Sequence, residues 1–359
     1  MLFRSEARAK KEVIQISDNG RTYKMGVVNI PLFYRDFEGQ RKHEEGASST
    51  TADVRKLIDS LKTENVDGIV IDLRGNGGGS LIEAIDLTGL FIAKGPVVQV
   101  REQNGETDVM SDNDPSVAYD GPLAILVDRF SASASEIFAA AIQDYKRGLI
   151  VGSQTFGKGT VQTLIDLNRM MPKEQDKLGQ VKLTIQKFYR INGSSTQHKG
   201  VTPDVALPSR YSAEDFGESS QPSALPWDQI ATARYEPSRF VNDRVLNRVR
   251  DQFEARLKTD PDLKQVSQEV ADFRKAKENT VVSLQIAKRQ KERDEADKKR
   301  LAAKKADDPD AADEPIALTD ETGVPAPKKP DAKPAKKKKD LYLTETGRIL
   351  ADYIIAVNK

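Results

Sequence analysis

The stretch GIVIDLRGNGGG at residues 68–79 decides how the fold of this chain is interpreted. Residues 68–73 form a short continuous apolar run, which is typical of a strand buried on both faces. The loop RGNGGG follows, and SLIEAIDLTGLFIA at 80–93 has the apolar spacing of a helix. A buried strand, a glycine loop and a helix make one unit of an α/β domain, so more such units are expected along the chain.

Strands and helices alternate on both sides of this unit. PLAILV at 122–127 is a second buried strand, and the loop DRFSAS leads into a helix at 135–147. This alternation predicts an α/β domain over residues 24–208. The other predicted strands are at 12–16, 25–34, 96–100, 148–152, 160–167 and 180–191, with a further helix at 52–65 and a polar loop at 102–121.

The composition of the chain changes after residue 208. Residues 209–237 have the Ser, Glu and Pro content of a surface connection, and 238–305 has the spacing of charged amphipathic helices. Residues 306–340 are Asp, Ala, Pro and Lys in low complexity, which favours disorder. Residues 341–359 regain apolar helical spacing, so a terminal helix is predicted there.

Composition excludes several kinds of site. The 359 residues contain no cysteine, which excludes disulfides, cysteine–zinc sites and thiol nucleophiles. The two histidines, His43 and His198, are too few for a histidine-ligated centre, so no metal or cofactor is expected. The net charge of +1 argues against a dedicated nucleic-acid-binding protein, and the lysine run 336–339 is interpreted as a solvated tail. No apolar run of about 18 residues predicts a membrane-spanning helix.

Two loops that follow buried strands have residues suited to chemistry. Three consecutive glycines in 74–79 let a backbone approach a ligand and present N–H groups to an anion, although a tight turn needs them equally. In SASASE at 131–136, a serine hydroxyl at a helix start lies beside free N–H groups that can stabilise an oxyanion. The same residues fit a capping box, Ser133-x-x-Glu136, and the two interpretations are compatible.

A third loop, GSQTFGKGT at 152–160, nearly matches the phosphate-binding pattern G-x-x-x-x-G-K-[ST]. Gly159 occupies the position of the required hydroxyl, and the next segment is rich in β-formers, so a nucleotide site is disfavoured. Lys158 is then either an exposed side chain or a desolvated one. A desolvated lysine has a lowered pKa and can act as general base for a serine nucleophile when no histidine is near.

Together, DLRGNGGG, VDRFSASASEIFAAAIQDYKR and TFGKGTVQT resemble the C-terminal processing peptidases, which are serine endopeptidases with a Ser-Lys dyad. The resemblance is closest to the tail-specific type of the bacterial periplasm, and it continues through QKFYRINGSSTQHKGVTPD and LPWDQI into the helical region. It implies an α/β protease core of the crotonase/ClpP-like kind, followed by a C-terminal helical region. It also implies a periplasmic location, peripheral to a membrane at most.

The resemblance implies roles for individual residues. Ser133, the middle serine of SASASE, would be the nucleophile, and Lys158, 25 positions later, would be the general base. Gln162 would orient that lysine, and Asp144 would support activity structurally. The remaining implied positions are Gly78 or Gly79 with Ala134 for the backbone oxyanion hole, Arg74 for the shape of the glycine loop, and Glu136 and Thr155 as further support.

Members of this family carry a substrate-binding PDZ domain ahead of the protease core. Residues 1–23 are too few for such a domain, so they are expected to be a remnant after a missing PDZ domain, and reduced activity is expected. The implied substrates are proteins with apolar C-terminal tails, with or without an adaptor protein that delivers them. The alternative is a non-catalytic scaffold or adaptor that uses the helices after 238, and a P-loop NTPase is a distant third.

Overall fold

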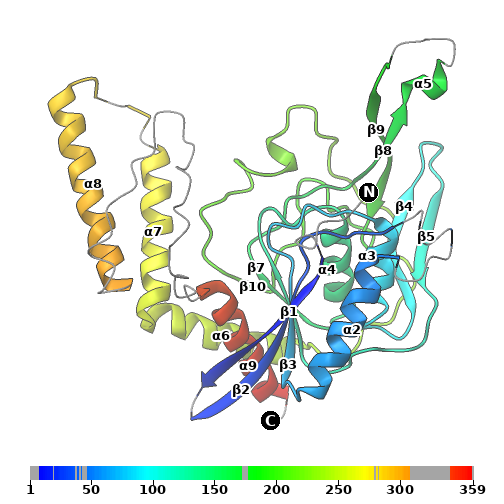
Figure 1. The fold of residues 1–359 in the computed structure, drawn as a ribbon, viewed down its shortest axis with the longest axis horizontal. Helices are drawn as coiled ribbons and strands as arrows, with labels where there is room; N and C mark the ends of the chain where they lie inside the picture. The colour runs from blue at the N-terminus through cyan, green and yellow to red at the C-terminus, as the bar shows by residue number, and fades with distance from the viewer. Residues whose placement is uncertain are drawn as a thin grey trace. The chain divides into compact units, whose positions relative to one another are not determined.

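The computed structural model describes residues 8–18, 20–36, 39, 42, 47–171, 177–278, 280–281, 283–307 and 340–357. The chain divides into two compact units, one of residues 1–270 with 340–359 and one of residues 271–339. The first unit contains all the strands of the described part and all the predicted site residues, and Figure 1 shows its elements. His43 lies outside the described residues.

A six-stranded sheet forms the centre of the first unit, in the order β1 (Lys10–Asp18), β2 (Arg21–Asn29), β3 (Gly68–Asp72), β6 (Leu123–Val127), β7 (Leu149–Gly152) and β10 (Val205–Ala206). The strands from β2 to β10 run parallel, and β1 pairs antiparallel with β2. All residues of β3 and β6 are buried, as the continuous apolar runs predicted.

Helices cover both faces of this sheet, and alternate residues of β3 show why. Ile69 and Ile71 join one apolar core, and Val70 joins the other. The helices in the first core are α2 (Thr50–Thr63), α3 (Leu81–Thr88) and α4 (Ala134–Asp144), and those in the second are α6 (Asp243–Thr259) and α9 (Leu341–Val357). Figure 1 shows α6 and α9 lying against each other. The segment after residue 340 therefore belongs to the same compact unit as the sheet.

A second, antiparallel sheet has the order β5 (Thr107–Asp112), β4 (Gly95–Arg101), β9 (Gln180–Tyr189) and β8 (Thr160–Asp166). β8 and β9 form a long hairpin that projects from the unit and carries the short helix α5 (Leu167–Met170) near its tip (Figure 1). The prediction of one polar loop at 102–121 is wrong where β5 forms. The residues of β5 are exposed or half-buried, so no apolar alternation marks this edge strand in the sequence.

The predicted helical region contains α6, α7 (Pro261–Glu278) and α8 (Ile286–Asp307), preceded by the short 3-10 helix η2 (Glu218–Ser220) in the connection. The disorder predicted for 306–340 begins too early, because residues 306 and 307 end α8. Residues 308–339 lie outside the described residues, so the rest of that prediction stays a prediction. None of the described helices has the length and apolar character that crossing a bilayer requires.

The packing of α9 on the sheet can be tested by truncating one leucine. Leu350 is fully buried, and a Cβ placed on Gly68 of β3 would lie 2.9 Å from Leu350 Cδ2. We expect Leu350→Ala to lower the free energy of unfolding by about 2–5 kcal/mol. Leu284→Ala is the matched control because Leu284 is 98% exposed. Urea unfolding of both variants checks this, and equal effects would contradict a structural role for α9.

Candidate active site

Three serines lie close together where α4 begins, but their surroundings differ. Ser131 and Ser135 are fully buried, and their hydroxyls donate at 2.9 Å to the carbonyls of Leu73 and Asn76. Ser133 is half-buried and lines a cavity of about 260 Å³. Of these three serines, the structure thus places the predicted nucleophile at the cavity and the other two inside the fold.

The backbone of Ser133 is held in an unusual conformation. Its φ of 58° and ψ of −114° lie in a region that costs a non-glycine residue of order 1–3 kcal/mol. Its N–H donates to Glu136 Oε2 at 2.8 Å, which is the carboxylate half of the predicted capping box. Such a turn keeps the Ser133 side chain at the positive end of the α4 dipole.

The glycine loop touches this turn directly. A Cβ on Gly78 would lie 2.8 Å from Ala132 O and from Ser133 Cβ, and 3.0 Å from Ala134 N. Gly78 and Gly79 have φ values of 104° and 143°, which residues with side chains rarely adopt. The loop therefore brings its backbone against the turn, which is the arrangement that an oxyanion hole needs.

Hydrogen bonding separates the candidate oxyanion donors. The Gly78 N–H donates to Asn76 Oδ1 at 2.9 Å, and the fully buried Asn76 side chain donates in turn to Ile30 O at 2.7 Å. Within the described residues, the N–H groups of Gly79 and Ala134 meet no such acceptor. Gly79 and Ala134 are therefore better candidates than Gly78. Sequence reasoning missed Asn76, whose only signal was its place between two glycines.

One buried carboxylate joins the nucleophile turn to the lysine loop. Glu136 is fully buried and lies one turn into α4. Burial raises its pKa to about 7, while hydrogen bonds to the carboxylate act in the opposite direction. The donors are the N–H groups of Ser133, Gly157 and Lys158, at 2.8, 2.7 and 3.0 Å, and the hydroxyl of Thr155, at 2.6 Å.

Lys158 is placed and tuned by its neighbours. It is half-buried in the loop between β7 and β8, and its Nζ donates to Gln162 Oε1 at 2.9 Å. Burial lowers the pKa of Lys158, and the positive charge of Lys182 lowers it further. Sequence reasoning missed Lys182 because only the β8–β9 pairing brings it near Lys158.

The cavity gathers residues from distant segments of the first unit. Ser133 and Lys158 both line it, although within the described residues no hydrogen bond joins Ser133 Oγ to Lys158 Nζ. His198 is not in the lining of the cavity, and the backbone N–H of His198 donates to Gly157 O at 2.7 Å. The full lining is Gly77, Gly79, Leu81, Ser133, Ala134, Ile137, Lys158, Thr160, Val161, Gln162, Lys182 and Phe188.

Five predicted residues, Arg74, Gly78, Glu136, Asp144 and Thr155, are not in the cavity lining, and two of them, Asp144 and Arg74, act on elements away from it. Asp144, at the far end of α4, accepts hydrogen bonds from Arg190 at 2.6 and 3.1 Å and from Asn192 at 2.8 Å. It therefore fixes α4 to the turn that follows β9, which fits the structural role implied for it. Arg74 bonds to Asp72 and to Asp340, each at 2.7 Å, and so ties the start of the glycine loop to the residue before α9.

The geometry gives little support to a phosphate-binding loop or a metal site in this part of the structure. Thr160 begins strand β8, so no helix follows the lysine loop to direct a dipole at a phosphate. Among the described residues, no group of three or more acidic or histidine side chains is placed to hold a metal ion. The site can supply a hydroxyl, an amine with a lowered pKa, and two N–H groups in one cavity.

The raised pKa of Glu136 predicts a pH dependence of stability. Between its ordinary value of 4.5 and about 7, the folded state binds more protons than the unfolded state. The free energy of unfolding should therefore fall as the pH rises through this window, by about 3 kcal/mol from this group. Urea unfolding at pH 5 and pH 8 should show this component in the wild type and not in Glu136→Gln. The same pH dependence in both proteins would contradict it.

The influence of Lys182 on Lys158 is a separate prediction. Lys182→Gln removes a positive charge near the Lys158 amine, so the pKa of Lys158 should rise. Lys182→Arg keeps the charge and is the matched control, with little change expected. An NMR titration of the lysine Cε resonances measures the pKa of Lys158 in each variant. A shift of equal size in the two variants would show that side-chain shape, and not charge, matters at residue 182.

Comparison with known proteins identifies the family. Residues 24–207 match the model of peptidase family S41, and residues 211–355 match that of the C-terminal domain of tail-specific protease. A tail-specific protease of Haemophilus influenzae is 38% identical over 333 residues, covering 92% of this chain and 45% of that protein. A chloroplastic C-terminal processing peptidase of Tetradesmus obliquus is 37% identical over 160 residues, covering 45% of this chain and 33% of the relative.

Among solved structures, the photosystem II D1 C-terminal processing protease is similar, with a TM-score of 0.45 and 29% sequence identity. That match covers 55% of this chain and 48% of the solved chain. The chain thus spans less than half of the length of each of these relatives. Because the S41 model matches more than half of its residues, this chain belongs to peptidase family S41.

Proposed function

We propose that this chain cleaves peptide bonds as an endopeptidase, with Ser133 as nucleophile and Lys158 as general base. The observation that carries the proposal is the Glu136 carboxylate, which binds the backbone N–H groups of both residues beside one cavity. Ser133 comes from the turn before α4, and Lys158 comes from the loop before β8. The carboxylate thus joins two loops, 25 positions apart, whose residues line the cavity that we propose receives the substrate carbonyl.

The proposed reaction uses groups that line the cavity. The lowered pKa of Lys158 increases the fraction of neutral amine, which accepts the proton of the Ser133 hydroxyl as Oγ attacks the carbonyl carbon. The N–H groups of Gly79 and Ala134 donate to the oxyanion of the tetrahedral intermediate. The protonated Lys158 then gives its proton to the leaving amine, and water releases the acyl group by the same sequence of steps.

The two side chains of the proposed dyad must come within hydrogen-bond distance before the proton moves. Lys158 Nζ donates to Gln162 Oε1, and in the described part of the chain it makes no hydrogen bond to Ser133. Catalytic hydrogen bonds are often long without substrate and tighten when it binds. Because Gln162 holds one N–H of the amine, the lone pair of neutral Lys158 is left for Ser133.

Substitution of the dyad tests the mechanism. We expect Ser133→Ala to lower kcat by about 10⁴-fold or more without changing the urea midpoint. Lys158→Arg keeps the positive charge but cannot lose its proton near neutral pH, so a similar loss is expected. Cleavage of a fluorogenic peptide measures both variants. High residual activity in Ser133→Ala would contradict the proposal.

The neighbouring serines provide matched controls for this test. Ser131→Ala and Ser135→Ala each remove a buried hydrogen bond, so they should lower stability while keeping Ser133-dependent cleavage. Loss of activity in one of them at unchanged stability would assign the nucleophile to that serine. A fluorophosphonate that labels the wild type and not Ser133→Ala also separates a peptidase from the scaffold alternative, which would take no label.

We also propose that the whole protein acts in the periplasm on proteins with apolar C-terminal tails, alone or with an adaptor. The support is the relation to the tail-specific protease of Haemophilus influenzae, of which this chain covers 45%. The test compares kcat/KM for one protein substrate that carries either an apolar or a charged C-terminal tail. Little discrimination by these 359 residues is expected if a PDZ domain outside them captures the tail, whereas a tenfold preference for the apolar tail would place tail recognition within them.

A further inference from the structure

The outer side of the glycine loop rests on the backbone of Phe33. The Phe33 N–H donates to Gly78 O at 3.0 Å, and Phe33 O accepts from the Ser80 N–H at 2.8 Å. A Cβ on Gly79 would lie only 2.2 Å from Phe33 O, so the two backbones are in direct contact. The position of the Gly79 N–H, a candidate oxyanion donor, therefore depends on where Phe33 lies.

The segment that contains Phe33 is held on its other side by the start of α2. Thr50 N–H donates to Tyr34 O at 3.0 Å, and Tyr34 N–H donates to the Thr50 hydroxyl at 2.8 Å. Asp36 N–H donates to Ser48 O at 2.8 Å. The segment 33–36 thus lies between α2 and the glycine loop. Its position therefore depends on the contacts that fix the spacing between α2 and α3.

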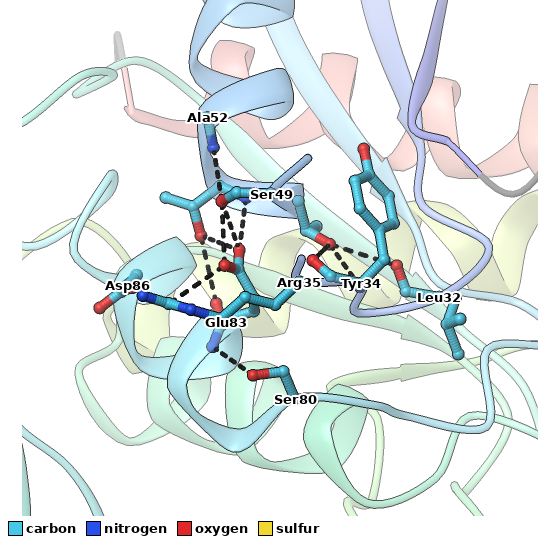
Figure 2. Close-up of polar contacts among 10 residues, drawn as sticks. Leu32, Tyr34, Arg35, Ser49, Ala52, Ser80, Glu83 and Asp86 are labelled. Carbon is cyan, nitrogen blue, oxygen red and sulfur yellow. Dashed lines mark hydrogen bonds and ion pairs between the residues drawn. The ribbon is translucent and has the colours of Figure 1, made fainter. Parts of the chain in front are cut away.

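A single buried carboxylate, that of Glu83, fixes that spacing (Figure 2). Glu83 is fully buried in the first turn of α3, and its N–H donates to the helix-capping hydroxyl of Ser80 at 3.3 Å. Its carboxylate accepts from the Ser49 hydroxyl at 2.9 Å and from the N–H and hydroxyl of Thr51, each at 2.8 Å. Arg35 also donates to it, at 3.2 Å.

We propose that Glu83 is a positioning residue for the oxyanion hole, because its carboxylate joins the starts of α2 and α3 around the segment that carries the glycine loop. Glu83 is not in the lining of the active-site cavity, so it acts through Phe33 and Gly79 and touches no substrate. This inference rests on the proposed function, since it names what places the Gly79 N–H opposite that of Ala134.

A positioning role and a purely structural role predict different results. Loss of any buried carboxylate with several donors lowers stability, because the donors are left without partners. Displacement of an oxyanion donor also weakens binding of the transition state, and small misplacements near the reacting atoms cost up to about 10²-fold in rate. The second effect lowers kcat and leaves substrate binding, and hence KM, nearly unchanged.

The experiment compares Glu83→Gln with Glu345→Gln in the full chain. Glu345 is also fully buried, and it accepts from Arg256 at 2.7 Å and from Arg348 at 3.3 Å, neither of which contacts the glycine loop through a hydrogen bond in the described part of the chain. Both variants should lose stability to a similar extent. Only Glu83→Gln should lower kcat, by about tenfold or more, with KM within about twofold. Its affinity for a peptide boronate, which forms a tetrahedral adduct on serine, should fall by the same factor as kcat.

Amide hydrogen exchange gives a readout that does not need activity. The amides of Phe33 and Ser80 should exchange faster in Glu83→Gln than in the wild type, and at the wild-type rate in Glu345→Gln. Ser49→Ala is the second variant, for use if Glu83→Gln does not fold. It removes one donor to the Glu83 carboxylate, so the amides of Phe33 and Ser80 should exchange faster than in the wild type, by a smaller factor.

Each result decides between the two roles. Equal kcat and equal exchange in the two glutamine variants would overturn the positioning role of Glu83. If the wild-type chain shows no Ser133-dependent cleavage or boronate binding, the proposed function fails. The exchange rates of Phe33 and Ser80 then decide alone whether Glu83 places the glycine loop, and unchanged rates in Glu83→Gln overturn that placement.

Discussion

The site depends on one carboxyl group, that of Glu136, which is buried away from water. Glu136 accepts four hydrogen bonds, and three of them come from backbone N–H groups on two separate loops. Burial disfavours the charged form of this group, and the hydrogen bonds offset part of that cost while they fix both loops to one side chain. Ser133 and Lys158 consequently behave as one structural element, although they lie on different loops.

Much of the fold was predictable because its central strands are buried on both faces. Such strands appear in sequence as continuous apolar runs, and β3 and β6 formed where these runs occur. β5 was not predicted, since an exposed edge strand carries no apolar alternation. The packing of α9 on the sheet was also not predicted, because a long low-complexity segment separates it from the strands that it covers.

The candidate site was likewise predictable only in part. Ser133, Lys158 and Gln162 stand in short motifs, so the resemblance to a known family was enough to name them as candidates. The contacts that hold the glycine loop were not visible, because each joins residues far apart in the chain. Arg74 and Asp340 are 266 positions apart, and Glu83 and Ser49 are 34 apart. Pairings of this kind follow from tertiary packing, which a single sequence does not encode locally.

The position of α9 has a consequence for synthesis of the chain on the ribosome. The sheet is complete once β10 has emerged, yet residues such as Val70 and Leu126 on its second face are covered in part by Leu350 and its neighbours on α9. A nascent chain therefore keeps an apolar face in water while roughly 130 more residues are translated. During that interval the strands and the glycine loop exist without the Arg74–Asp340 tie, which forms only after the segment that contains Asp340 has been translated.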